Sequence, residues 1–206
     1  MKVIVFAATK GGVGKSTLAY NVGMYASREH QVLFADLDPQ ASLAELWTRR
    51  GELINPRLIK NVNSLASTVA RLREAGYQHD YLFVDTPGSH IPIIRDAIAA
   101  ADTVVLPVQA SVLDVLGQDA AFDLVESTGR HDHALILLNR VQGAAKAFNE
   151  KIETLLKTQT RLPVIRVAQR AAYAKAGAEA KTGAEIDKEA AAEIAAVWKA
   201  TQGVMQ

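Results

Sequence analysis

The chain has 206 residues, of which 49% are hydrophobic and 22% charged, and its net charge at pH 7 is +1. This length and composition predict one ordinary globular domain over residues 1–206, with a sizeable buried core. The lack of cysteine excludes disulfides, thiolate metal sites and iron–sulfur clusters, and the small net charge means that any nucleic-acid binding has to come from a local patch.

Short apolar runs alternate with helical patterns along the chain. The runs predict strands at residues 2–8, 31–36, 81–85, 103–108, 134–139 and 162–167. The helical patterns lie between the strands, first over Leu18, Val22 and Ala26 and then at 64–76, 91–101, 114–127, 147–158 and 185–201. The irregular region 51–63 predicts either an extra strand or a loop. We therefore expect an α/β fold with a mostly parallel, twisted sheet flanked by helices on both faces.

The start of the chain bears on its cellular location. The first predicted strand begins at residue 2, which leaves no room for a signal peptide. No apolar run approaches the length that crosses a bilayer. We therefore expect a cytoplasmic protein.

The segment "TKGGVGKST" (9–17) follows the first predicted strand and opens the first predicted helix. Its glycines allow successive backbone N–H groups to turn toward a phosphate, and the positive end of the helix faces the same anion. In such a loop Lys15 reaches the β- and γ-phosphates, and the Ser16 hydroxyl binds magnesium. The segment therefore predicts a nucleotide site. Its predicted contact residues are Gly11, Gly12, Val13, Gly14, Lys15, Ser16 and Thr17.

One position departs from the ordinary phosphate-binding loop. Thr9 stands where that loop has glycine, and Lys10 follows it. "KGGVGKST" resembles the deviant Walker A motif of the ParA/MinD family of P-loop ATPases. The resemblance implies a single-domain ATPase that uses ATP and Mg²⁺, in which Lys10 contacts the ATP of the partner in a nucleotide-sandwich homodimer and acts in catalysis with Lys15. The alternative for Lys10 is a solvated lysine at the edge of the loop.

The segment "FADLDPQAS" (34–42) follows the second predicted strand, at the edge of the sheet where ligands bind in open α/β folds. It resembles the second motif of the same family. The resemblance implies that Asp38 positions the attacking water, that Asp36 supports magnesium and the loop, and that residues 39–42 form a first switch. The alternative is that the two aspartates only cap a helix.

Two further segments follow predicted strands. "YLFVDTPGS" (81–89) resembles a Walker B motif, in which Asp85 holds magnesium through water. The resemblance also implies that Gly88 lies in a second switch that changes when the γ-phosphate leaves. Asn139 corresponds to an asparagine that the family often places on the adenine edge, although asparagine after a strand is equally a common turn residue.

The resemblance to the ParA/MinD family covers residues 2–170. Within that family the chain is most similar to the small ParA-type proteins. The predicted first strand opens the chain, so we expect no N-terminal helix-turn-helix domain, as in small ParA-type proteins. Residues 185–206 carry four acids against two lysines. An acidic helix is repelled by anionic lipid, so no membrane partner is expected.

The strongest local excess of positive charge lies at residues 161–181, which hold five cations and one acid. This segment resembles the corresponding part of small ParA-type proteins, in which basic residues late in the chain bind DNA phosphates independently of the DNA sequence. The alternative is a solvated helix face. The predicted DNA-binding residues are Arg161, Arg166, Arg170 and Lys175.

These features predict a slow ATPase that dimerises on ATP, binds nonspecific DNA and is released after a cargo-bound, ParB-like protein stimulates hydrolysis. The expected location is the cytoplasm, on the nucleoid, and the cargo is a plasmid, a chromosome region or another large body. The alternatives are a membrane-associated positioning ATPase like MinD, a small-molecule P-loop enzyme and a nucleotide-regulated scaffold with negligible catalysis.

Overall fold

The computed structural model describes residues 1–51 and 53–205. Within these residues seven strands form one sheet in the order β3-β2-β4-β1-β5-β6-β7, and every neighbouring pair is parallel. The strands are β1 (Lys2–Phe6), β2 (Val32–Asp36), β3 (Arg57–Ile59), β4 (Tyr81–Asp85), β5 (Thr103–Gln109), β6 (Ala134–Val141) and β7 (Val164–Ala168).

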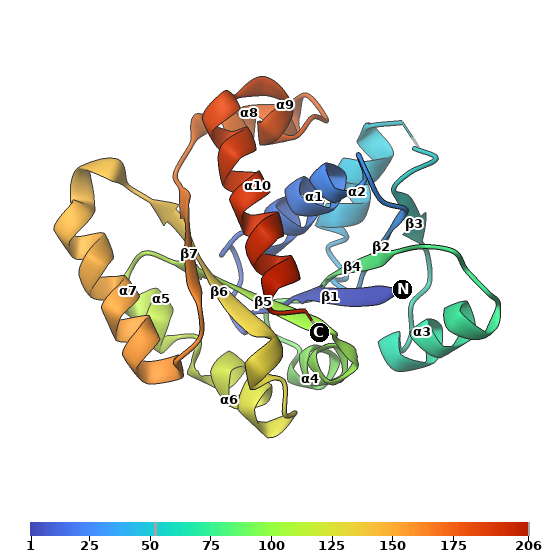
Figure 1. The fold of residues 1–206 in the computed structure, drawn as a ribbon, viewed down its shortest axis with the longest axis horizontal. Coiled ribbons are helices and arrows are strands. Elements are labelled where there is room, and N and C mark those ends of the chain that lie inside the picture. The colour runs from blue at the N-terminus through green and yellow to red at the C-terminus, as the bar shows by residue number, and fades with distance from the viewer. Residues whose placement is uncertain (52, 206) are drawn as a thin grey trace.

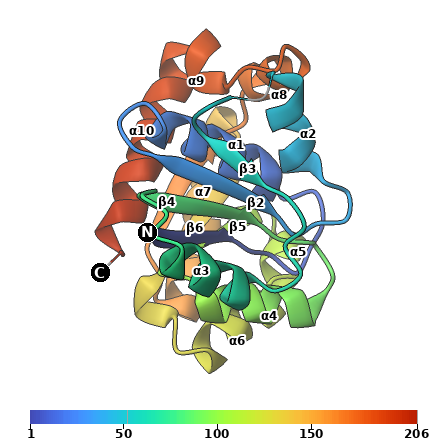
Figure 2. The ribbon, with the colours of Figure 1, turned by 90° about the vertical axis from the view of Figure 1, so that its right-hand side faces the viewer.

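Helices cover both faces of this sheet (Figures 1 and 2). One face carries α1 (Lys15–Ala26), α2 (Ser42–Arg49), α8 (Ala171–Ala178), α9 (Gly183–Ile186) and α10 (Lys188–Gly203). The other face carries α3 (Leu65–Glu74), α4 (Ile91–Ala100), α5 (Val112–Leu116), α6 (Asp119–Ser127) and α7 (Lys146–Thr160). Short 3₁₀ turns occupy His131–His133 and Gly143–Ala145.

The core consists of two apolar layers, one on each side of the sheet. Along β1 successive side chains point to opposite faces, so Val3 and Val5 pack with α3, α4 and α6, whereas Ile4 and Phe6 pack with α1 and α10. All four are fully buried. A strand buried on both faces has to be apolar throughout, which is why the strands read as unbroken hydrophobic runs.

The structure confirms the predicted fold class, and it differs from the sequence expectations in α2, in α8, which no pattern predicted, and in the helix expected at 114–127. The irregular region 51–63 contains β3, and the helix expected at 114–127 is two helices, α5 and α6, separated at Gly117. The sequence pattern did not predict α2. Its N-cap residue, Ala41, has a left-handed backbone and offers no side-chain cap. Asp36 accepts a hydrogen bond from the Ala44 N–H instead, at 3.0 Å.

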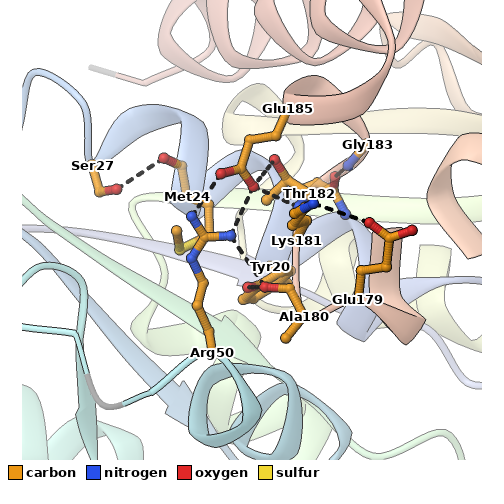
Figure 3. Close-up of polar contacts among 11 residues, drawn as sticks. Tyr20, Met24, Ser27, Arg50, Glu179, Ala180, Lys181, Thr182, Gly183 and Glu185 are labelled. Atoms are coloured by element: carbon orange, nitrogen blue, oxygen red, sulfur yellow. Dashed lines mark hydrogen bonds and ion pairs between the residues drawn. The ribbon is translucent and has the colours of Figure 1, made fainter. Parts of the chain in front are cut away.

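The end of α2 is tied to α9 by a polar network (Figure 3). Arg50 donates two hydrogen bonds to the Glu185 carboxylate, at 2.6 and 2.8 Å, and a third to the Ala180 carbonyl, at 3.1 Å. Partial burial raises the pKa of Glu185, but hydrogen bonds from Arg50 and Thr182 outweigh it and lower the pKa to about 2. The helix that follows residues 37–41 is thereby anchored to the C-terminal part of the chain.

Candidate functional site

The loop between β1 and α1 has the geometry of an anion cradle. Gly12 and Gly14 have φ values of 75° and 101°, which residues with a side chain rarely adopt. A Cβ atom on Gly14 would lie 2.4 Å from Nδ2 of Asn139, so glycine is also required there by space. The first turn of α1 begins at Lys15 and directs its free N–H groups to the same point. This arrangement suits a phosphate.

Lys15 is the cation of this cradle. Its side chain is only 6% exposed, and its Nζ donates to the Lys10 carbonyl at 3.3 Å. Burial lowers the pKa of Lys15, and the negative charges of Asp85 and Asp38 act in the opposite direction. A buried ammonium group held between a carbonyl and two carboxylates is positioned to bind an anion that enters the loop.

Asp85 lies at the end of β4 and is 0% exposed. Within the described residues neither of its carboxylate oxygens accepts a hydrogen bond of good geometry, although the Ser16 hydroxyl lies near enough to stabilise the charged form. Burial raises the pKa of Asp85 to about 7, the Ser16 hydroxyl and the Lys15 charge oppose this rise, and the neighbouring Asp36 adds to it. A buried carboxylate beside a phosphate cradle fits a divalent cation, because Mg²⁺ is held by one or two protein oxygens together with phosphate oxygens and water.

Asp36 has a different setting. Its two oxygens accept backbone hydrogen bonds from Asp38 and Ala44, both at 3.0 Å, so the carboxylate shapes the loop and caps α2. The described residues contain no group of three or more His, Asp or Glu that could hold a metal ion without further ligands. Ser16 and Asp85 offer oxygens that suit Mg²⁺ together with a bound phosphate and water. The contribution of Asp36 to a magnesium site stays a prediction.

The raised pKa of Asp85 predicts a pH dependence of stability in the absence of nucleotide and magnesium. Between pH 4 and 7 the folded state holds a proton that the unfolded state releases, so the free energy of unfolding falls as the pH rises toward about 7. We expect Asp85→Asn to remove this fall and to be more stable than the parent protein at pH 8. Urea unfolding at pH 5.5 and pH 8 measures both effects. Identical pH dependence in the two proteins would contradict the assignment.

The expected switch segments line a cavity of about 710 Å³ above the phosphate loop. Asp38, Pro39, Gln40 and Ser42 contribute from the β2 side. Pro87, Gly88 and Ser89 contribute from the β4 side. Asp38 accepts a hydrogen bond from the Gln40 N–H at 2.9 Å, which tightens the loop. A Cβ atom on Gly88 would lie 3.0 Å from the backbone of Gly11, so the two loops approach too closely for any larger residue.

Lys10 points away from the cradle of its own chain. Its Nζ forms an ion pair with Asp114 of α5 at 2.5 Å, and its side chain is 42% exposed. Burial alone would raise the pKa of Asp114, but hydrogen bonds from Lys10 and Ser111 outweigh it and lower the pKa. Lys10 therefore lies at the surface beside α5, whereas Lys15 lies inside the cradle.

A second cavity of about 300 Å³ is lined by Gly14, Thr17 and Leu18 and by residues at the ends of β6 and β7 and at the start of α8. Asn139 lines it and is 8% exposed. Its Nδ2 donates to the Val13 carbonyl at 2.8 Å, so its amide braces the phosphate loop. The adenine contact assigned to Asn139 stays a prediction.

The four predicted DNA-binding residues come from different elements and differ in their ion pairing. Arg166 donates to Glu153 at 2.6 Å, and Arg170 forms ion pairs with Glu189 and Glu193 while it lines the second cavity. Arg161 precedes the edge strand β7, and Lys175 lies in α8 after it. These last two cations have no ion-pair partner among the described residues. The DNA-binding assignment of all four residues stays a prediction.

The sequence pattern did not indicate two polar residues that hydrogen-bond to the phosphate loop, one at the end of β5 and one between α5 and α6. Gln109 donates to the Gly12 carbonyl at 2.9 Å, and Gln118 accepts from the Thr9 N–H at 3.3 Å. The only signal for Gln109 is its position at the end of a buried strand next to β1. Gln118 lies between α5 and α6 and is 1% exposed, which no local pattern indicates.

The chain matches a known protein family and is similar to known positioning proteins. Residues 4–182 match the family model of the CobQ/CobB/MinD/ParA nucleotide binding domain. The chain is 35% identical over 137 residues to the chromosome-partitioning ATPase Soj of Thermus thermophilus, covering 52% of this chain and 54% of that one. It is 25% identical over 165 residues to the maintenance of carboxysome distribution protein A of Gloeothece citriformis, covering 62% and 64%.

Solved structures share the fold. The ATP complex of an aspartate-to-alanine variant of McdA from Cyanothece superimposes with a TM-score of 0.79 at 22% identity, over 100% of this chain and 98% of that one. The chain spans between half and two thirds of the length of the two curated relatives above. Among the described residues no helix combines the length and the hydropathy needed to cross a membrane.

Proposed function

Since the chain belongs to the CobQ/CobB/MinD/ParA family of nucleotide-binding domains, we propose that it is an ATP-dependent positioning ATPase of the small ParA type. It hydrolyses ATP slowly to ADP and phosphate and uses the nucleotide state to bind and release a large cargo. The phosphate cradle around Lys15, the buried Asp85 and the second cavity beside Asn139 support this proposal, because together they offer a site for each part of a magnesium nucleotide.

The observation that carries the proposal is the separation of the two lysines of the loop. Lys15 is buried inside the cradle, and Lys10 lies at the surface next to α5, where Leu113 and Leu116 are 77% and 55% exposed. Exposed leucines beside an accessible lysine support contact with a second copy of the chain. In the proposed dimer Lys10 exchanges Asp114 for the phosphates held by the partner subunit.

In the proposed cycle the switch segments 38–42 and 87–89 sense whether a γ-phosphate is present, and Asp38 positions the water that attacks it. Dimerisation joins two sets of cations, so weak contacts to DNA phosphates from each subunit add through avidity. A cargo-bound, ParB-like protein stimulates hydrolysis and releases the dimer from the nucleoid. Arg161 and Lys175 are the DNA contacts with no ion-pair partner among the described residues, whereas Arg166 and Arg170 would have to exchange carboxylates for phosphates.

The relatives named for chromosome partitioning and for carboxysome distribution support a large cargo as a class. A membrane partner is less well supported. The surface of α10 carries Glu189 and Glu193 as well as Lys188 and Lys199, so the helix lacks the basic face that anionic lipid attracts.

We expect Lys10→Ala to bind ATP in the monomer with an affinity similar to that of the parent, because Lys10 does not enter the cradle of its own chain. Its ATP-dependent dimer should be weaker by about tenfold or more, since a charged contact to phosphate is lost on each side. Sedimentation with a non-hydrolysable ATP analogue and with ADP measures this, with Lys60→Ala as an exposed-lysine control. If the Lys10→Ala dimer were as stable as that of the parent, the proposed role of Lys10 would be wrong.

A further inference from the structure

Arg140 lies at the end of β6 in an unusual backbone conformation. Its φ is 56°, and it is the one residue with a positive φ inside a strand of the described chain. The Arg140 N–H donates to Oδ1 of Asn139 at 2.9 Å, while Nδ2 of the same amide is bound to the Val13 carbonyl. The phosphate loop, through Asn139, therefore fixes the backbone of Arg140. Strain held in place by surrounding contacts is typical of functional positions.

Arg140 lines both cavities of the site. It contributes to the cavity of about 300 Å³ beside Asn139 and to the cavity of about 710 Å³ that contains Asp38 and Gly88. Of the residues that line these cavities, Gly14 and Thr17 are the others shared by both, and they belong to the phosphate loop and α1. Arg140 is thus the cationic side chain at the junction between the base side and the phosphate side.

Unlike its cationic neighbours, Arg140 makes no hydrogen bond or ion pair from its side chain in the described residues, although its charge helps to lower the pKa of Asp114. Lys15 donates to a carbonyl, Lys10 pairs with Asp114, and Arg170 pairs with two glutamates. An exposed guanidinium at a cavity junction is available for a planar, two-pronged contact with phosphate oxygens.

We propose that Arg140 binds the nucleotide of its own subunit at the junction of the ribose and the α-phosphate. The inference deepens the proposed function and rests on it. The position of Arg140 between the two cavities indicates which phosphate it contacts. The base occupies the cavity beside Asn139, and the β- and γ-phosphates occupy the cradle, so a cation at the boundary between the two meets the part of the nucleotide that joins them. Arg140 is then a binding residue that does not distinguish ATP from ADP.

Calorimetric titration of the magnesium complexes of ATP and ADP, with AMP as a third ligand, tests this inference. The variant is Arg140→Asn, because asparagine is neutral and tolerates a positive φ. We expect its Kd for all three ligands to rise by the same factor, about tenfold to a hundredfold. Arg140→Lys keeps the positive charge but cannot make the two-pronged guanidinium contact, so it should recover part of the lost affinity. Arg28→Asn, at the far end of α1, is the matched control and should bind as the parent does.

The outcomes separate the inference from the function on which it rests. Unchanged affinity in Arg140→Asn would overturn the inference, and so would a loss confined to ATP, which would place the contact at the γ-phosphate. Failure of the parent protein to bind either ATP or ADP would overturn the proposed function itself. Circular dichroism and thermal unfolding of each variant show whether a loss of binding comes from a loss of structure.

Discussion

Replacing Lys15 by alanine is expected to abolish the nucleotide-dependent behaviour of the protein. The Lys15 ammonium group is 6% exposed and is held inside the cradle by the Lys10 carbonyl, so its contact with a phosphate takes place away from water, where a charge-assisted hydrogen bond is strong. Losing that contact should weaken ATP binding by about a hundredfold or more. Calorimetry with magnesium and ATP measures the loss.

The same substitution should not unfold the protein. Burial lowers the pKa of Lys15, which means that the folded state pays a desolvation cost to keep the ammonium charged. The loss of this cost offsets the loss of charge compensation for Asp85 and Asp38, so nucleotide-free Lys15→Ala should still unfold cooperatively, at a temperature close to that of the parent. Lys199→Ala, on the exposed side of α10, is the control and should bind ATP normally. ATP affinity close to that of the parent in Lys15→Ala would contradict the position given to the phosphates.

Replacing Asp38 by alanine is expected to have the second large effect, on the rate of ATP hydrolysis and not on ATP affinity. Asp38 lines the cavity above the cradle and bonds only to its own loop, through the Gln40 N–H. A carboxylate there is free to orient a water molecule, and loss of such a group typically slows the chemical step by about a hundredfold to ten-thousandfold. ATP binding should persist, because the cradle is built from other residues.

Phosphate release and sedimentation, measured on the same sample of Asp38→Ala, separate the two steps. The expected result is an ATP-bound dimer that accumulates and does not turn over, even with an activating partner present. Asp132→Ala, whose side chain is 92% exposed in a surface turn, is the control and should hydrolyse ATP as the parent does. Normal turnover in Asp38→Ala would show that another group positions the water and would favour a different catalytic residue.

The sequence was sufficient to predict the sheet and the phosphate cradle because their signals are local. Buried parallel strands have to be apolar throughout, and the two loop glycines at positive φ, Gly12 and Gly14, are separated only by Val13. The same holds for Asp85, which the end of an apolar run identifies without knowledge of its neighbours. Periodicity also located most helices, although the break between α5 and α6 depends on the burial of Gln118 against the loop after β1.

The contacts that decide the state of each charge were not predictable, because they join residues far apart in sequence. Lys10 meets Asp114, and Arg170 meets Glu193. A count of cations over residues 161–181 treats Arg166 and Arg170 as free, whereas folding pairs both with glutamates. Conversely, Arg140 did not stand out in the sequence, and only the fold places it between two cavities. Net charge over a segment therefore says little about which cations remain available.

The measurement that tests the account most directly is the binding of the protein to a fluorescently labelled DNA duplex of arbitrary sequence, with magnesium and ATP, with ADP, or without nucleotide. Each titration is made at two salt concentrations and repeated with a second, unrelated duplex. We expect binding only with ATP, equal for the two duplexes and lost in Lys10→Ala. Salt should weaken this binding, because phosphate contacts release counterions. Equal binding in all nucleotide states, or no binding in any of them, would contradict the account.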